Sequence, residues 1–117
     1  MTTVAGRAEV THDLIRVLVA DARGPERLRC RLDLADDGFA VVAEAVEARQ
    51  AVAVAAFEAP DVVILDPDLP NDHHVDVLSE LNARAPRAAV LLYRPEDAGD
   101  LQAVVRQAVA RPAAIWI

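Results

Sequence analysis

The sequence predicts an α/β fold, a doubly wound sheet of five parallel strands with helices on both faces. Apolar runs of strand length alternate along the chain with longer segments whose apolar residues recur at helical spacing. The run Val62-Val63-Ile64-Leu65 has no polar alternation, which is typical of a strand buried on both faces of a sheet. Strands and helices that alternate in this way form a parallel sheet with right-handed crossovers.

Five strands and four helices are expected, and the elements alternate. The strands are expected at 14–20, 39–46, 61–66, 88–93 and 113–117. Each helix is expected to bury its apolar stripe. These stripes are Leu28, Leu32 and Ala35; Ala48, Ala51, Val52 and Ala55; Val75, Leu78 and Leu81; and Leu101, Val104, Val105, Ala108 and Val109. Residues 1–13 form a polar lead that we expect to be flexible, and residues 14–117 form one domain.

The composition excludes several classes of function. At 117 residues and 54% hydrophobic, the chain can bury one core. Its formal net charge of −7 disfavours binding to nucleic acid, because a phosphate backbone is held by clustered cations. Any contact with DNA therefore requires a separate domain. No stretch approaches the ~20 apolar residues of a membrane span. We expect a cytoplasmic protein that does not bind membranes.

The residue types that are absent narrow the chemistry further. All twelve basic residues are arginine, which excludes a Schiff-base or Walker lysine. The four glycines are scattered singly, so no phosphate-binding loop follows any strand. Cys30 is the only cysteine, which excludes an internal disulfide and fits a reducing compartment. On its helix Cys30 is expected to be structural and unreactive.

Two carboxylates follow apolar strands. Asp66 ends the third predicted strand and is followed by Pro67 and Asp68, and Asp21 ends the first. In open α/β sheets, ligands bind outside the carboxyl ends of the strands. We therefore expect Asp21 and Asp66 to lie together at that edge, within about one metal-bridging distance of each other. A purely structural role for Asp66, as a capping carboxylate, is the alternative.

These segments resemble a known family. Leu-Val-Ala-Asp at 18–21, Val-Val-Ile-Leu-Asp at 62–66 and Pro70 are similar to the receiver domain of bacterial two-component response regulators. Segments 15–20 and 39–45 resemble the branch with a C-terminal helix-turn-helix output domain. The resemblance implies a flavodoxin-like fold with strand order 2-1-3-4-5. It also implies that Asp66 accepts a phosphoryl group from a histidine kinase and that the Asp68 backbone carbonyl binds Mg²⁺. The domain would not itself be an enzyme.

The chain departs from the family pattern at several matched positions. Ala22 stands where the family has a second metal-binding acid. Tyr93 stands at the switch position where the family has a Ser or Thr whose hydroxyl moves onto the phosphoryl group, and it is too large for the same pocket without rearrangement. Ile115 is placed at the aromatic switch position, and the phosphate-pairing lysine is missing. Mg²⁺ prefers several oxygen ligands, so Asp21, Asp66 and the Asp68 carbonyl are expected to bind it weakly.

These departures affect the reaction, because phosphoryl transfer depends on positioning and charge neutralisation. One lost cation at ~4 Å could cost up to ~4 kcal/mol at an effective dielectric near 20. Slow phosphorylation is therefore expected. Arg23 or Arg94 could supply a substitute cation, and the Asp68 carboxylate could replace the lost ligand. The alternative is that both arginines are exposed to solvent and have no role at the site.

The segment 71–76 contains two histidines and two aspartates and invites a metal hypothesis. His73 and Asp76 have the i, i+3 spacing of metal ligands on a helix. Consecutive side chains diverge, however, and polar residues are common where a helix begins. Helix capping is therefore the preferred interpretation.

Three functions remain open. The first is a signalling input domain with a degenerate phosphorylation site, which responds to a ligand, a partner or its oligomeric state. The second is a phosphoacceptor receiver that works despite Ala22 and Tyr93. The third is an unrelated flavodoxin-like enzyme or ligand-binding module.

The C-terminal segment favours self-association. A receiver has a further helix after its fifth strand, whereas this sequence ends within the apolar stretch 113–117, so either the chain is an excerpt of a longer regulator or that helix is missing. The fourth predicted helix also offers more apolar surface than one narrow stripe, at Leu101, Val104, Val105, Ala108 and Val109. An apolar surface left without that helix commonly marks an interface. We therefore expect a homodimer with Trp116 as its anchor, and packing of Trp116 inside its own domain is the alternative.

Overall fold

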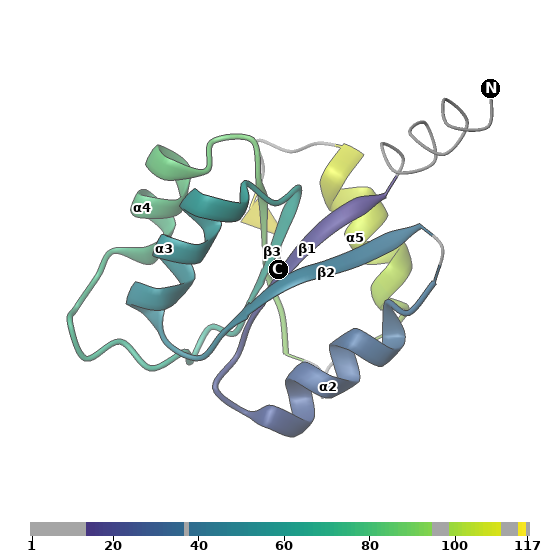
Figure 1. The fold of residues 1–117 in the computed structure, drawn as a ribbon, viewed down its shortest axis with the longest axis horizontal. Coiled ribbons are helices and arrows are strands. Elements are labelled where there is room, and N and C mark those ends of the chain that lie inside the picture. The colour runs from purple at the N-terminus through teal and green to yellow at the C-terminus, as the bar shows by residue number, and fades with distance from the viewer. Residues whose placement is uncertain (1–13, 37, 95–98, 111–114, 117) are drawn as a thin grey trace, which may run out of the picture.

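The computed structural model describes residues 14–36, 38–94, 99–110 and 115–116, and of the last two it describes the backbone (Figure 1). Its strands are β1 Ile15–Ala20, β2 Phe39–Ala45, β3 Val62–Leu65, β4 Ala89–Leu92 and β5 Ile115–Trp116. Its helices are α2 Gly24–Asp33, α3 Ala48–Glu58, α4 Val77–Arg84 and α5 Leu101–Ala110. None of these helices is long and apolar enough to cross a membrane. The expected alternation of strands and helices is therefore confirmed.

The sheet is parallel, and its strands lie in the order β2-β1-β3-β4-β5. The first four strands confirm the predicted order. Of the fifth strand, predicted at 113–117, the structure describes Ile115 and Trp116, which pair with β4 opposite Val90 and Leu91. Residues 111–114 and 117 lie outside the described part of the chain. The lead at 1–13 lies outside it as well.

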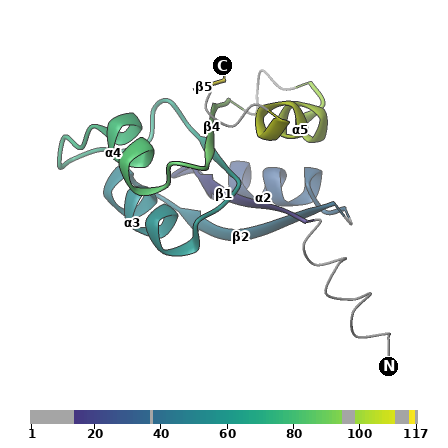
Figure 2. The same ribbon diagram turned by 90° about the horizontal axis from the view of Figure 1, so that it is seen from above.

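Helices cover both faces of the sheet (Figures 1 and 2). α3 and α4 pack on one face, over Leu18, Val63 and Val90. α2 and α5 pack on the other, over Val17, Ile64 and Leu91. Successive residues of β1, β3 and β4 therefore point into different cores, which explains why these strands are continuously apolar.

The last crossover differs from the other three. The chain moves toward one edge of the sheet from β1 to β2 and toward the opposite edge from β2 to β3, β3 to β4 and β4 to β5. A single hand would place α2 on one face and α3, α4 and α5 together on the other. α5 instead shares the face of α2 (Figure 2). The β4–α5–β5 crossover therefore has the opposite hand, and the prediction of uniform handedness was wrong.

The buried face of α2 also differs from the prediction. Leu28 and Leu32 are 46% and 65% exposed, whereas Cys30 is buried in the helix and Leu34 at its C-terminal cap. Both pairs have i, i+4 spacing, so periodicity alone does not choose between them. In this orientation two arginines of the helix contact Glu44 of β2. Arg27 Nε lies 2.9 Å and Arg31 Nε 3.2 Å from the two Glu44 carboxylate oxygens.

The other helices follow their predicted stripes more closely. In α3 all four predicted residues are buried: Ala48, Ala51, Val52 and Ala55. In α5, Leu101, Val105 and Ala108 are buried. α4 fully buries Leu81 alone of its predicted three. Leu78 is partly buried, as is Val75, which lies in the loop before the helix start at Val77.

Candidate functional site

The two predicted carboxylates lie side by side at the carboxyl edge of the sheet. Ala20 of β1 is in register with Leu65 of β3, so the next residues, Asp21 and Asp66, leave adjacent strands together. The Asp66 N–H donates to the Ala20 carbonyl at 2.9 Å. Asp21 and Asp66 are 4% and 6% exposed, and they are the buried charged residues of the described chain. The juxtaposition expected from the sequence is therefore present.

Arg23 lies between the two carboxylates. Its backbone N–H and its Nε both donate to Asp21 Oδ1, at 2.8 and 3.1 Å. Its Nη2 donates to Asp21 Oδ2 at 3.0 Å and lies 3.8 Å from Asp66 Oδ2. Planar pairing through two guanidinium nitrogens is the strongest form of an arginine–carboxylate contact. One cation thus serves both acids.

A second arginine engages the third acid of the site. Arg94, after β4, donates from Nη1 to Asp68 Oδ2 at 2.7 Å. The Asp68 N–H donates to Asp66 Oδ1 at 3.0 Å, so the loop after β3 folds back onto its own carboxylate. Both arginines singled out in the sequence are therefore bound to the acids. The alternative that they are simply solvated does not hold.

The residues present do not fit a Mg²⁺ site in this arrangement. Mg²⁺ needs a nearly octahedral set of oxygen ligands. Here the Asp21 carboxylate is bound by Arg23 and the Asp68 carboxylate by Arg94, and Ala22 offers no oxygen in its side chain. Within the described ranges, no three His, Cys, Asp or Glu side chains are grouped so that they could hold a metal ion.

Tyr93 does not lie in the position expected of a residue that closes over Asp66. Its N–H donates to the Leu65 carbonyl at 3.1 Å, so its backbone continues the β3–β4 pairing. Its half-buried side chain packs against the core between the sheet and α2 and α5. Burial, followed by the charges of Cys30 and Asp33, raises the pKa of Tyr93 to about 12. Ile115, the second predicted switch position, and Trp116, the predicted interface anchor, are described by their backbone alone.

Cys30 is buried in the same core. Burial raises the pKa of its thiol to about 12, and the charge of Asp21 adds to the effect. A thiol with so high a pKa is a poor nucleophile at neutral pH. This agrees with the unreactive role expected from the sequence.

The polar segment 71–76 forms a turn and a helix cap. Asn71 closes the turn, because its Oδ1 accepts from the Val75 N–H at 2.8 Å and its Nδ2 donates to the Val75 carbonyl at 2.7 Å. Asp76 caps α4 by accepting from the Ser79 N–H at 3.2 Å. His73 is exposed, and the capping interpretation is the one that these hydrogen bonds support.

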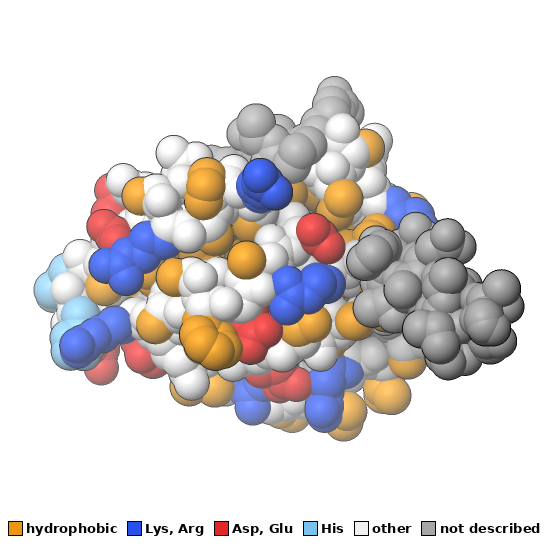
Figure 3. Space-filling view, turned by 45° about the horizontal axis from the view of Figure 1, so that its top comes forward, with side chains coloured by type: hydrophobic (Ala, Val, Ile, Leu, Met, Phe, Trp, Pro, Cys, Tyr) orange, Lys and Arg blue, Asp and Glu red, His pale blue; other side chains and the backbone are white. Residues whose placement is uncertain are grey.

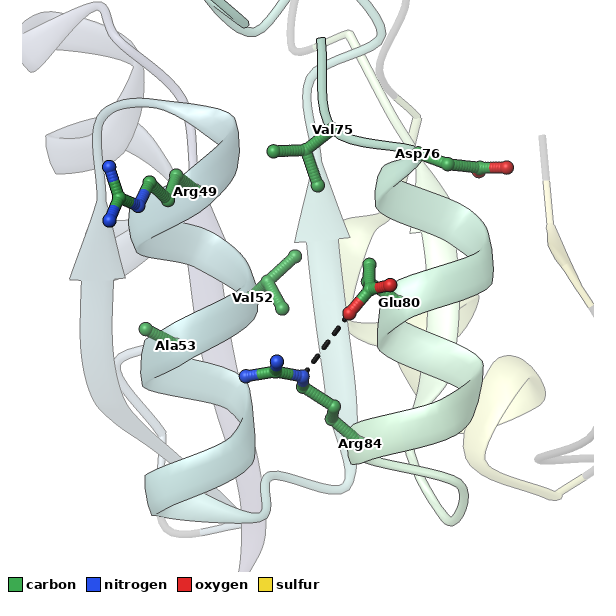
Figure 4. A pocket seen from close by; sticks show the side chains of 7 residues that line it. All are labelled: Arg49, Val52, Ala53, Val75, Asp76, Glu80 and Arg84. Atoms are coloured by element: carbon green, nitrogen blue, oxygen red, sulfur yellow. Dashed lines mark ion pairs between the residues drawn. The ribbon is translucent and has the colours of Figure 1, made fainter. Parts of the chain in front are cut away.

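Two hollows lie near these elements. A pocket of about 320 Å³ is bordered by Asp66, the β3–α4 loop, the start of α4 and the end of β4. A groove of about 450 Å³ lies between α3 and α4, where Arg84 extends across the gap beside its ion pair with Glu80 at 3.2 Å (Figure 4). The sequence predicted neither, because each combines segments that are distant in the chain.

Comparisons with known proteins agree with this architecture. The family model of the response regulator receiver domain matches residues 17–110. The transcriptional regulatory protein PdtaR of Mycobacterium tuberculosis is 30% identical over 100 residues, which are 78% of this chain and 49% of PdtaR. A putative transcriptional regulator of Pseudomonas aeruginosa is 35% identical over 68 residues, or 58% of this chain and 33% of the relative. The chain thus spans half or less of these relatives.

Solved structures give the same result. The receiver domain of the putative response regulator NarL from M. tuberculosis has a TM-score of 0.64 and 26% identity, and the match covers 89% of this chain and 82% of that one. The response regulator domain of Thermotoga maritima CheB has a TM-score of 0.63 and 25% identity, with 89% and 77% covered. With the match of the family model, they show that the chain belongs to the response regulator receiver domain family.

Proposed function

We propose that the chain is the signal-input domain of a response regulator and that Arg23 replaces Mg²⁺ at its acidic site. In this proposal phosphorylation of Asp66 is slow, and the domain changes state mainly through a bound ligand or partner. The domain catalyses no reaction of its own. A separate output domain would act on transcription, as the names of both curated relatives suggest.

The position of Arg23 is the observation that carries the proposal. Its guanidinium is hydrogen-bonded to Asp21 and lies 3.8 Å from Asp66, so it occupies the Asp21 carboxylate and offsets part of the negative charge that would otherwise attract a metal. Mg²⁺ would have to displace this contact and would then still lack the ligand replaced by Ala22. The arginine is part of the chain, so it competes with the metal at every metal concentration.

The surface also supports a separate DNA-binding domain. On the face shown in Figure 3, arginines lie beside acidic side chains rather than forming one basic surface. Several arginines of the described chain are in ion pairs, such as Arg16 with Glu58 at 3.1 Å and Arg27 with Glu44 at 2.9 Å. Arginines engaged in this way contribute little to binding a phosphate backbone.

A conventional phosphoacceptor is the second candidate, and the same arginine is the observation that favours it. Asp66 Oδ2 faces Arg23, while Oδ1 accepts the Asp68 N–H. A phosphoryl group on Oδ2 would place its charge beside the guanidinium, which could pair with it in place of the missing lysine. A histidine kinase would then be the phosphodonor.

Phosphorylation with a small donor separates the two candidates. The chain is incubated with acetyl phosphate and Mg²⁺, and the acyl phosphate is measured by intact mass. We expect little phosphorylation of the unaltered chain and more, by about tenfold, in the double variant Ala22→Asp/Arg23→Ala. Arg29→Ala, which removes an exposed arginine of the following helix α2, is the matched control. Rapid, stoichiometric phosphorylation of the unaltered chain, abolished by Asp66→Asn, would refute the proposal.

A further inference from the structure

The pocket beside Asp66 combines a carboxylate with an apolar wall. Its volume is about 320 Å³, and it lies between the end of β3, the β3–α4 loop, the first turn of α4 and the end of β4. The lining residues are Leu65, Asp66, Pro67, Leu69, Asn71, Val75, Asp76, Val77, Leu78 and Leu92. This volume lies at the lower end of the range for small-molecule sites.

The polar lining has a negative charge. The side-chain amide of Asn71 bonds to Val75, and Asp76 accepts the Ser79 N–H at the start of α4. Asp66 is 6% exposed, accepts one hydrogen bond from the Asp68 N–H and lies 3.8 Å from Arg23. An ionised carboxylate can accept about four hydrogen bonds. Among the described residues that line the pocket, none has a cationic side chain.

The apolar lining is incompletely covered. Leu78 and Leu92 are half-buried and pack against the core that lies between the sheet and α3 and α4. A β4–β5 crossover of the same hand as the others would place its helix on this face, next to α4. Because α5 lies on the opposite face, it does not cover these leucines.

We propose that this pocket binds a small organic cation with an aliphatic body. The ammonium or amidinium group would donate to Asp66, and the hydrocarbon part would contact Leu78 and Leu92. Charge complementarity favours a cation over an anion, since the charged lining residues are both acids. The inference rests on the proposed function in one respect, namely that Asp66 is an unmodified carboxylate. The α3–α4 groove is a poorer site, because Arg84 and Glu80 extend into it (Figure 4).

Methyl and amide NMR with simple probes tests the proposal. The unphosphorylated chain is titrated with n-hexylamine at neutral pH, where the amine is protonated, and separately with n-hexanol and sodium hexanoate. We expect saturable shifts at Leu69, Leu78 and Leu92 with the amine at millimolar concentration, weaker ones with the alcohol and none with hexanoate. The absence of saturable shifts with the amine, or equal binding of hexanoate, would overturn the proposal.

Two variants identify the parts of the site. Asp66→Asn should lower the affinity for n-hexylamine by about tenfold or more, because a charged hydrogen-bond acceptor is lost. The affinity for n-hexanol should stay the same. Leu78→Arg should abolish the binding of both probes, whereas Leu32→Arg, at an exposed position of α2, should abolish neither. Circular dichroism confirms that each variant is folded. An Asp66→Asn variant that binds the amine as the unaltered chain does would contradict the assignment.

The outcome is independent of the phosphorylation experiment. Binding is measured without a phosphodonor or Mg²⁺, so a failure here leaves the role proposed for Arg23 intact. Rapid phosphorylation of the unaltered chain would refute that role and would not alter the binding of n-hexylamine to the unphosphorylated protein.

Discussion

Arg23 Nη2 lies 3.0 Å from Asp21 Oδ2 and 3.8 Å from Asp66 Oδ2. A guanidinium thus lies between the two acids that follow β1 and β3. Asp21 and Asp66 are almost fully buried, whereas the Arg23 side chain is 44% exposed. A buried carboxylate pair without a nearby cation would be costly, so Arg23 stabilises the edge of the sheet as well as changing its chemistry.

Removing this arginine should increase Mg²⁺ binding. Arg23→Ala frees the Asp21 carboxylate, and we expect the affinity for Mg²⁺ to rise about tenfold, equivalent to about 1.4 kcal/mol. Ala22→Asp in addition should raise it further, because it restores a direct oxygen ligand. Isothermal titration calorimetry measures both, with Arg29→Ala as the control. Unchanged affinity in the double variant would mean that something other than Arg23 and Ala22 prevents metal binding.

Two leucines at the C-terminal end of α2 test which side of this segment is buried. Leu34 is 2% exposed and Leu32 is 65% exposed. Leu34→Ala should lower the free energy of unfolding by about 2–5 kcal/mol, as expected for a buried leucine, and Leu32→Ala by less than about 0.5 kcal/mol. Urea denaturation followed by circular dichroism gives both values. Equal losses would contradict the orientation of α2 described here.

Stability should fall at alkaline pH because of Cys30. Burial raises the pKa of its thiol from an ordinary value of 9.0 to about 12 in the folded protein. Below pH 9 the thiol is protonated in both the folded and the unfolded states, so the full stability is present. Between pH 9 and about 12 only the unfolded chain loses the proton, which lowers the free energy of unfolding.

Two measurements test the burial of the Cys30 thiol. Urea denaturation at pH 8 and pH 10 should show this loss in the unaltered chain and a smaller loss in Cys30→Ala. The pKa of Tyr93 is also raised to about 12, so Tyr93 accounts for part of the stability loss that Cys30→Ala still shows above pH 10. A thiol reagent such as Ellman's should modify Cys30 slowly in the folded protein at pH 8 and rapidly in urea. Equally fast modification of the folded protein would show that the thiol is accessible.

The homodimer remains a prediction. Of the five apolar residues of α5 that favoured an interface, Leu101, Val105 and Ala108 are buried inside the domain, which leaves less apolar surface for a partner. We still expect sedimentation equilibrium at tens of micromolar to detect a dimer that Trp116→Ala weakens. A monomer of 12.6 kDa, unaffected by that substitution, would leave packing within the domain as the role of Trp116.

Local patterns in the sequence determined the elements and the position of the acids. The run Val62–Leu65 is apolar at every position, which, with the alternation of strand and helix patterns around it, predicts a central parallel strand. Asp21 and Asp66 follow two such strands, and parallel strands share a carboxyl edge, so their proximity could be inferred without coordinates. Capping of α4 by Asp76 was equally local.

The tertiary structure alone decided how these elements are oriented. α2 has two stripes of i, i+4 spacing, and in the fold the stripe with Cys30 and Leu34 is buried while Arg27 and Arg31 pair with Glu44 of β2. α5 is apolar on more than one side, so its sequence is compatible with either face of the sheet. The sequence left Arg23 and Arg94 as alternatives, and the fold placed one between Asp21 and Asp66 and the other on Asp68. Such choices depend on contacts between distant segments, which periodicity and local composition do not contain.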